Sequence, residues 1–162
     1  MAGWVFRAAA LAAVLAGVLL VAGRDARADT VISGFPCVVD GDTLQIGGRL
    51  VEGRCTGGIE VRLHGILAPD AGDTCRDARG EHWPCGVSAM ETLSGIIRRR
   101  DIDCYHVHGA FEADMPLVTC ISGRFDVAAE MVLAGAARVS AESNRYRVEQ
   151  AGAKRNRRGL WR

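Results

Sequence analysis

The sequence predicts a single domain of the β-rich α+β class. Segments in which apolar and polar residues alternate are concentrated between residues 36 and 66 and again between 101 and 122. Segments with an apolar residue at every third or fourth position begin near residues 85 and 126. A period of two is typical of half-buried strands, and a period near 3.6 is typical of amphipathic helices. The chain is long enough for one hydrophobic core.

The first 28 residues have the composition of a secretory signal peptide. Arg7 is followed by the apolar run 8–22, and "ARA" at 26–28 supplies small residues two positions apart. This order of charge, apolar run and small residues is the pattern of a cleaved export signal. We expect cleavage after Ala28, which places a single domain at 29–162 in the periplasm or outside the cell. The alternative is an uncleaved anchor.

The apolar run is too short to favour that alternative. It holds 15 residues, and a helix needs roughly 20 to span a bilayer. We therefore expect no stable membrane insertion after cleavage.

Five short strands are expected in the mature chain. They are 36–46, broken at an Asp-Gly pair, 49–55, 59–66, "DIDCYHVHG" at 101–109 and "PLVTCIS" at 116–122. Between the third and the fourth, residues 67–84 have the composition of turns and loops, with two prolines and three aspartates. Strands that are short and separated by turn residues are typical of small sandwiches and barrels, the OB-type barrel among them.

Three helices are expected. The segment 85–99 would place four apolar residues, Val87, Met90, Leu93 and Ile97, on one stripe that faces a core. The segment 126–137 is a short helix with Asp126 as a suitable N-cap. The basic segment 144–158 is expected to form the terminal helix.

The chain has six cysteines, and all of them follow the expected cleavage site: Cys37, Cys55, Cys75, Cys85, Cys104 and Cys120. An even number of cysteines in an exported chain indicates disulfides, here three. A zinc site of cysteines would need closely spaced pairs such as C-x₂-C, and no two cysteines of this sequence are that close. Six cysteines allow 15 pairings. Neighbours that would face each other across hairpins and loops favour 37–55, 75–85 and 104–120.

Basic residues are concentrated at the C-terminal end. Residues 145–162 contain seven Lys or Arg and one Glu, while the whole chain has a formal net charge of +1. We interpret this segment as a solvated helix end, whose cations suit the negative end of the helix dipole, with Leu160 and Trp161 packed back on the domain. A phosphate-binding patch is the alternative. Aromatic residues make up only 6% of the chain, which gives little support for base stacking.

The stretch "VVDGDTLQI", residues 38–46, places Asp40 and Asp42 on either side of a glycine. One interpretation is a type I′-like turn, in which Asp-Gly is preferred. The other is one half of a cation site, because carboxylates are the ligands of hard cations. The second interpretation needs further ligands elsewhere in the chain.

Three histidines are candidate ligands. His106 and His108 would share one face of a strand. No third metal ligand follows at a suitable spacing, so exposed strand histidines are the simpler interpretation. His64 lies on the same strand face as Arg62, where it would either contact a bound phosphate or remain a surface side chain.

Three segments in order, "VVDGDT" (38–43), "VRLHGILAP" (61–69) and "RRGLW" (157–161), resemble the staphylococcal nuclease (thermonuclease) family. The segment "FDVAAEMVLAGAARV" (125–139) resembles the family as well, so the likeness covers roughly residues 35–161. It implies an OB-fold five-stranded barrel capped by three helices. It also implies Ca²⁺-dependent hydrolysis of phosphodiesters in DNA and RNA.

The resemblance assigns roles to four residues. Asp42 corresponds to a metal ligand, and Thr43 stands beside it. Arg62 corresponds to an arginine that binds and stabilises the phosphate. Asp70 takes the place of the family's glutamate, which activates or orients the attacking water. Together they would form a metal-assisted phosphoryl site.

At two further positions the sequence departs from the family. Leu67 stands where the family has its second carboxylate ligand, and Met115 stands where it has a second phosphate-binding arginine. With Asp42 alone, Ca²⁺ binding would be weak, because affinity follows the number of charged ligands. Losing one donor to the transition state typically costs about 10²–10³-fold in rate. Asp70 is also one methylene shorter than glutamate.

We therefore expect a catalytically degenerate, monomeric module that binds nucleic acid or another anionic ligand, or has a structural role. The alternative is an active metal-dependent phosphodiesterase in which Asp70, Asp73 or Asp114 replaces the missing ligand. Burial of Leu67 would favour the first hypothesis. A second carboxylate beside Asp42 would favour the alternative.

Overall fold

The computed structural model describes residues 31–98, 100–112 and 115–162, and of residues 108–112 it describes only the backbone. The expected signal peptide, its cleavage after Ala28, and Asp114 lie outside the described residues. Within the described ranges no helix is both long and apolar enough to cross a membrane.

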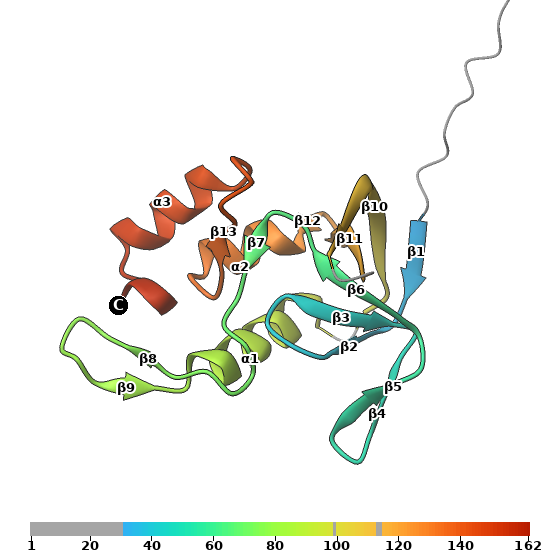
Figure 1. Cartoon of the computed structure of the whole chain (residues 1–162), viewed down its shortest axis with the longest axis horizontal. Helices are drawn as coiled ribbons and strands as arrows, with labels where there is room; N and C mark the ends of the chain where they lie inside the picture. Colours follow the sequence, from blue (N-terminus) through green and yellow to red (C-terminus); the bar gives the residue numbers. More distant parts are fainter. Residues whose placement is uncertain (1–30, 99, 113–114) are drawn as a thin grey trace, which may run out of the picture.

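The β-rich α+β class is confirmed (Figure 1). The strands are β1 (Val31–Gly34), β2 (Pro36–Val38), β3 (Thr43–Ile46), β4 (Arg49–Val51), β5 (Arg54–Thr56), β6 (Ile59–Leu63), β7 (Ile66–Leu67), β8 (Cys75–Arg76), β9 (His82–Trp83), β10 (Ile102–Glu112), β11 (Met115–Ser122), β12 (Phe125–Asp126) and β13 (Arg138–Val139). The helices are α1 (Cys85–Ile97), α2 (Val127–Leu133), α3 (Arg147–Arg155) and the 3₁₀ turn η1 (Gly159–Trp161).

The described strands outnumber the five that we expected. Several of them, such as β7, β8 and β13, contain only two residues. Two residues are too few to show an alternating pattern, so these strands cannot be recognised in the sequence. The region 67–84, expected to be loop, contains two of them as the β8–β9 pair.

The main sheet has seven strands, paired in the order β1-β10-β11-β6-β3-β2, with β12 beside β11. The pairing between β6 and β11 is parallel, and the others in this sheet are antiparallel. A register shift interrupts the β10–β11 pairing between His106 and Phe111. The parallel pair brings β11 beside β6, so residues 55 positions apart in sequence, such as Arg62 and Leu117, meet in the middle of the sheet.

The sheet is strongly curled. Its two outermost strands, β1 and β2, are consecutive in sequence and separated only by Phe35. The edges therefore lie close together, and the Gly47 N–H donates to the Phe35 carbonyl over 2.8 Å. The described strands nevertheless form no closed ring of hydrogen-bonded neighbours, so the expected five-stranded barrel is not confirmed.

The core lies between the sheet and the helices α1 and α2. Its most deeply buried large side chains include Leu44, Leu63, Leu93, Ile102, Met131, Val118 and Val132. In α1, Leu93 and Ile97 are buried as expected, and the buried face differs from the expected one in its first half. Ala89 is 1% exposed whereas Val87 is 46% exposed, because the small Ala89 faces the closely packed Asp-Gly-Asp turn described below.

The other two helices are shorter than expected. Asp126 caps α2 as expected, since its Oδ1 accepts the N–H groups of Ala128 and Ala129. The helix then ends at Leu133, and the following Gly135 has φ 72, a left-handed conformation that ends helices. The terminal helix α3 begins at Arg147 because Tyr146 also has a positive φ of 64.

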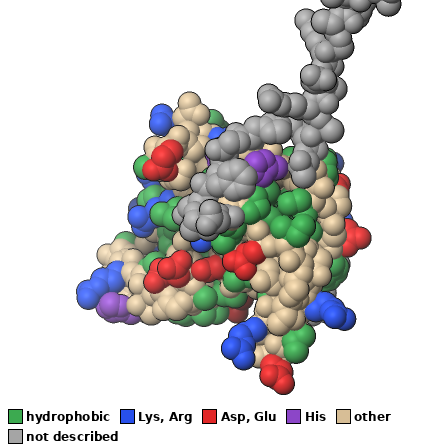
Figure 2. Space-filling model, turned by 45° about the vertical axis from the view of Figure 1, so that its right-hand side comes forward, with side chains coloured by type: hydrophobic (Ala, Val, Ile, Leu, Met, Phe, Trp, Pro, Cys, Tyr) green, Lys and Arg blue, Asp and Glu red, His purple; other side chains and the backbone are tan. Residues whose placement is uncertain are grey.

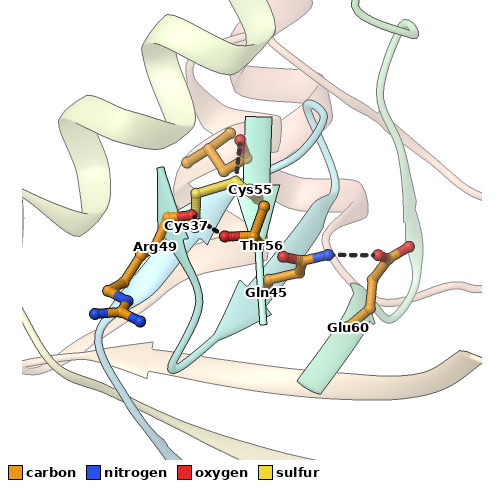
Figure 3. The surroundings of a disulfide bond; sticks show 7 residues. Cys37, Gln45, Arg49, Cys55, Thr56 and Glu60 are labelled. Atoms are coloured by element: carbon orange, nitrogen blue, oxygen red, sulfur yellow. Dashed lines mark hydrogen bonds between the residues drawn. A yellow bond between two sulfur atoms is a disulfide. The ribbon is translucent and has the colours of Figure 1, made fainter. Parts of the chain in front are cut away.

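Three disulfides are present, and they join 37–55, 75–85 and 104–120, the three pairs expected from sequence neighbourhood. Cys104 and Cys120 face each other directly across β10 and β11. The first disulfide holds the projecting β4–β5 hairpin against β2 (Figures 1 and 3). Beside it, Gln45 Nε2 donates to Glu60 Oε2 over 3.0 Å and joins β3 to β6 (Figure 3).

Candidate functional site

The strand register brings together the residues that the family resemblance singled out. Thr43 on β3 is paired with Arg62 on β6, and Arg62 is in turn beside Leu117 on β11. Side chains of paired residues point to the same face of a sheet. Asp42 comes directly before β3, so its side chain lies at the edge of this face.

The carboxylate of Asp42 is buried and bonded within the protein. Its Oδ2 accepts the backbone N–H of Ala68 over 3.1 Å, and its Oδ1 accepts the hydroxyl of Thr43 over 3.0 Å. The Arg62 Nε lies 3.6 Å from the same Oδ1 and donates to the Thr43 hydroxyl over 3.3 Å. Only 5% of Asp42 is exposed. The carboxylate therefore acts here as a hydrogen-bond acceptor that joins three segments of chain.

Among the described residues, Asp42 does not belong to a cluster of three or more carboxylate, histidine or cysteine side chains that could hold calcium. Ca²⁺ is bound by six to eight oxygen ligands in proteins. Both oxygens of Asp42 already accept protein hydrogen bonds, and the Arg62 cation lies beside one of them. Across the described residues, no group of three or more His, Cys, Asp or Glu side chains is arranged to hold a metal ion.

The turn before β3 is held by close packing rather than by an Asp-Gly hairpin conformation. Gly41 has no positive φ, so the type I′-like interpretation is wrong. A Cβ at this position would lie 2.7 Å from the Ala68 Cβ and 2.8 Å from the Ala89 Cβ. The glycine is required because the turn is pressed between the loop after β7 and helix α1.

Asp40 lies on the more open side of this turn. Its Oδ1 accepts the Gly41 N–H over 2.7 Å. Partial burial raises the pKa of Asp40 above its ordinary value, and the negative charges of Asp42 and Asp70 raise it further, against the opposing effects of the Gly41 N–H and Arg62. Three carboxylates are thus close enough to act on one another.

Asp70 is exposed at the start of a tight turn. Its N–H donates to Asp73 Oδ2 over 3.0 Å, and its carbonyl accepts the Asp73 N–H over 2.8 Å. The Asp70 carbonyl also rests against Gly86 in the first turn of α1, where a Cβ would overlap it. The Cys75–Cys85 disulfide joins the same two segments. The position of Asp70 is therefore fixed by its backbone, while its carboxylate faces solvent.

Leu67 is exposed, so the burial that would have favoured a catalytically degenerate site is not observed. It is 59% exposed and pairs with Arg138 across β7 and β13. Both residues line a cavity of ≈ 230 Å³ that also includes Asp73 and Leu160. Leu67 provides an apolar surface where the family resemblance requires a carboxylate.

Met115 opens β11 and is half-buried. It lies two residues before Leu117, so Met115, Leu117 and Arg62 share one face of the sheet. The neighbours of Arg62 on β11 are therefore apolar. No second cation reaches Arg62 from this strand.

A second arginine reaches the same face from elsewhere in the chain. The Arg145 guanidinium contacts Thr119 Oγ1 at 3.4 Å and Asp126 Oδ2 at 3.2 Å. Its side chain stacks on the ring of Tyr146, 5.1 Å from the ring centroid. Sequence reasoning missed Arg145 because it was placed inside a terminal helix. No local pattern indicates that a loop would bring it beside β11.

The three histidines that the sequence offered as candidate ligands are not placed in a common site by the described residues. His64 is half-buried, and its Nδ1 has no hydrogen-bond partner among the described residues. His106 is half-buried rather than exposed as expected, and the side chain of His108 is not described. These histidines form no metal site within the described chain.

The C-terminal "RRGLW" segment packs back on the domain, as expected. Leu160 donates its N–H to the Gly135 carbonyl over 2.8 Å. The cations of Lys154 and Arg138 lie 4.4 Å and 5.2 Å from the centroid of the Trp161 ring. The side chains of Lys154 and Arg138 thus help to hold the C-terminal segment on the domain through their contacts with Trp161.

The face drawn in Figure 2 has acidic side chains gathered near its middle. Carboxylates that face solvent together create a negative potential, which repels a polyanion unless cations intervene.

The fold and the site together define a disulfide-linked α+β domain in which Asp42, Thr43 and Arg62 contact one another.

No known protein-family profile matches the chain. A stretch of 87 residues is 32% identical to the succinoglycan biosynthesis protein ExoI of Rhizobium meliloti (strain 1021), which covers 54% of this chain and 39% of that protein. The chain thus spans less than half the length of this relative. The relative's name places it in succinoglycan biosynthesis and says nothing of its reaction.

Proposed function

We propose that this chain is an exported, staphylococcal-nuclease-like domain of OB type in which the metal-dependent chemistry has been lost. It would act as a monomeric binding or structural module. The observation that carries this proposal is the bonding of Asp42. Its two carboxylate oxygens accept hydrogen bonds from Ala68 and Thr43, and the Arg62 guanidinium already places a positive charge beside Oδ1.

Three further features support the proposal. The curled sheet, covered by helices, is compatible with an OB-type barrel that is not fully closed. Three disulfides suit an oxidising compartment and hence an exported protein. The apolar residues Leu67 and Met115 remove a metal ligand and a phosphate-binding cation from the family's arrangement.

The proposed ligand is anionic and binds beside Arg62. The Arg62 side chain is 29% exposed, and Arg145 lies on the same sheet face. Nucleic acid is one such ligand. Because the relative ExoI is named for succinoglycan biosynthesis, a saccharide polymer with acidic groups is the other ligand to test.

A second candidate is an active metal-dependent phosphodiesterase with an altered ligand set. It is favoured by one observation, the contribution of the Asp42 and Asp70 charges to the raised pKa of Asp40. Asp40 and Asp70 would then supply the oxygens that the position of Leu67 lacks, and Ca²⁺ or Mn²⁺ would bind between them.

Hydrolysis of single-stranded DNA by the purified chain, with millimolar Ca²⁺, with Mn²⁺ or with EDTA, tests the proposal. We expect no metal-dependent cleavage by the wild type. The triple variant Leu67→Asp, Met115→Arg, Asp70→Glu should gain cleavage that EDTA abolishes. The matched control is Leu67→Asn, Met115→Gln, Asp70→Gln, which introduces polar side chains without the charges and should remain inactive.

Cleavage by the wild type that requires a metal ion and is lost in Asp70→Asn would establish the second candidate instead. If neither wild type nor triple variant cleaves DNA although both are folded, the scaffold does not have the nuclease architecture that the resemblance implies.

A further inference from the structure

A separate cavity of ≈ 830 Å³ lies at the C-terminal end of α1. Its walls come from the last turns of α1, the β11–β12 hairpin and the first turn of α2. The Asp42 cluster lies near the other end of α1, where the Gly86 N–H donates to the Asp73 carbonyl. Since α1 has 13 residues, its ends are roughly 20 Å apart at 1.5 Å per residue. The cavity is thus independent of the function proposed above.

Positive charge dominates this cavity. Arg98, Arg100 and Arg124 all line it, and Glu130 is the one carboxylate among the described lining residues. Within the described chain none of the three guanidinium groups forms an ion pair with a carboxylate. Three cations around one cavity repel one another, so an anion bound between them would stabilise the arrangement.

Arg98 is held in a conformation that disfavours arginine. It follows α1 as the C-cap residue with φ 43, in the left-handed region, and its N–H donates to the Ser94 carbonyl. Glycine is the usual residue in this conformation, because it has no Cβ to clash. Arginine is present instead, with its side chain on the cavity, and such backbone outliers often mark functional positions.

The cavity also offers an aromatic surface. Ser122 and Phe125 pair at the end of the β11–β12 hairpin, and Gly123 and Arg124 form its two-residue turn. Phe125 is 48% exposed on the cavity, and the Arg124 guanidinium lies 5.1 Å from the centroid of its ring. A flat ring of a ligand can stack on such a surface while guanidinium groups bind its anionic end.

We propose that this cavity binds a phosphorylated compound with a flat aromatic ring, of which a nucleoside monophosphate is the simplest biological example. Arg98 and Arg100 bind the phosphate, since a guanidinium matches phosphate oxygens with two parallel hydrogen bonds. The ring of the ligand packs against Phe125 and Arg124. Thr92 and Ser122 also line the cavity. The Thr92 hydroxyl donates to the Ser88 carbonyl, so it would serve the ligand as an acceptor. The volume lies within the range of about 300–1,000 Å³ that is usual for ligand sites.

Titration calorimetry of the full, disulfide-bonded chain with adenosine 5′-monophosphate tests this proposal, with adenosine and inorganic phosphate as partial ligands. We expect the monophosphate to bind more tightly than either part. Backbone amide NMR shifts should change at Gly123–Phe125 and not at Gly41 or Ala68.

Arg98→Gly should weaken binding by about ten-fold or more, the usual scale for losing one charge-assisted phosphate contact. This variant also relieves the left-handed backbone, so it should unfold at the same temperature as the wild type or higher. Arg157→Gly is the matched control. Arg157 has φ 51, is exposed and does not line the cavity, so its replacement should leave the affinity unchanged.

Three outcomes would overturn the proposal. The first is no binding of the monophosphate. The second is equal weakening in Arg98→Gly and Arg157→Gly, which would indicate unspecific attraction to positive charge. The third is equal affinity for inorganic phosphate and the monophosphate, which would remove any role for Phe125.

Discussion

Ala68 donates its backbone N–H to Asp42 Oδ2 over 3.1 Å, and this bond joins the start of β3 to the loop after β7. The same carboxylate accepts from Thr43 and lies beside Arg62. A residue that the family resemblance would assign to a metal thus has a structural role that needs no metal. The role of Asp42 can be tested separately from any activity.

Asp42→Asn should destabilise the fold. The amide has one oxygen in place of two, so one of the donors from Ala68 and Thr43 loses its acceptor. Hydrogen bonds to a charged group typically contribute about 1.5–3 kcal/mol, and we expect a loss of that size in urea unfolding without metal. Glu142→Gln, at an exposed position, is the control and should have no effect. Unchanged stability of Asp42→Asn in EDTA would contradict the structural role.

Gly41→Ala should be destabilising even though its φ is accessible to alanine. The new methyl would lie within 2.8 Å of the Cβ atoms of Ala68 and Ala89. Overpacking of this kind typically costs about 1–3 kcal/mol. Gly72→Ala is the matched control, since a Cβ there meets nothing within 4 Å and its φ is not positive. Thermal unfolding of both variants measures the difference, and an equal melting temperature for the two would show that the turn is not tightly packed.

Two glycines of α1 should respond in opposite directions to alanine. At Gly86 a methyl would overlap the Asp70 carbonyl, so the loop that carries Asp70 has to move and the protein should be destabilised. At Gly95 a methyl meets nothing within 4 Å, and alanine should stabilise the helix by about 0.5–1 kcal/mol. Urea unfolding of both variants gives the comparison. A stable Gly86→Ala variant would mean that α1 and the Asp70 turn are not in close contact.

The parts of the fold that could be predicted are those with a repeated pattern or a strong local signal. Alternation predicted β3 and β6, and helical periodicity predicted α1. The N-cap at Asp126 follows from a single polar residue before an apolar run. The disulfides could be predicted because each pair joins segments close in sequence.

The parts that could not be predicted depend on contacts between distant segments. The parallel pairing of β6 with β11 places Leu117 beside Arg62, and nothing local to either strand encodes it. The burial of Leu93 and Ile97 was predicted, but Val87 was wrongly placed on the buried face of α1. Val87 is more apolar than Ala89, while the space beside Gly41 admits only the smaller side chain. The hydrogen bond to Asp42 was also missed. Its donor is the backbone N–H of Ala68, and a backbone donor leaves no trace in the identity of a side chain.

Asp40 should make stability fall as the pH rises from about 3 to about 7. Burial, with Asp42 and Asp70, raises its pKa in the folded state above the ordinary value. The unfolded chain then binds fewer protons than the folded one, so the free energy of unfolding decreases as pH rises through the two pKa values. Asp40→Asn keeps the oxygen that accepts the Gly41 N–H and removes the charge. The variant should therefore melt above the wild type near pH 7 and at the same temperature near pH 3.

Asp77→Asn is the control, because its effect on the melting temperature near pH 7 should be opposite to that of Asp40→Asn. The N–H groups of Glu81 and Arg79 donate to Asp77 Oδ1 and, with the Arg79 cation, hold its pKa below the ordinary value, against the opposing effect of burial. The charged form of Asp77 stabilises the fold fully when the pH is above the pKa of Asp77 in the unfolded chain. This stabilisation is lost as the pH falls through the lower pKa of Asp77 in the folded protein. Asp77→Asn should therefore melt below the wild type near pH 7, with a smaller difference at acid pH. If Asp40→Asn instead melts below the wild type near pH 7, the Asp40 charge is stabilised in the fold, and a cation between Asp40, Asp42 and Asp70 becomes the better explanation.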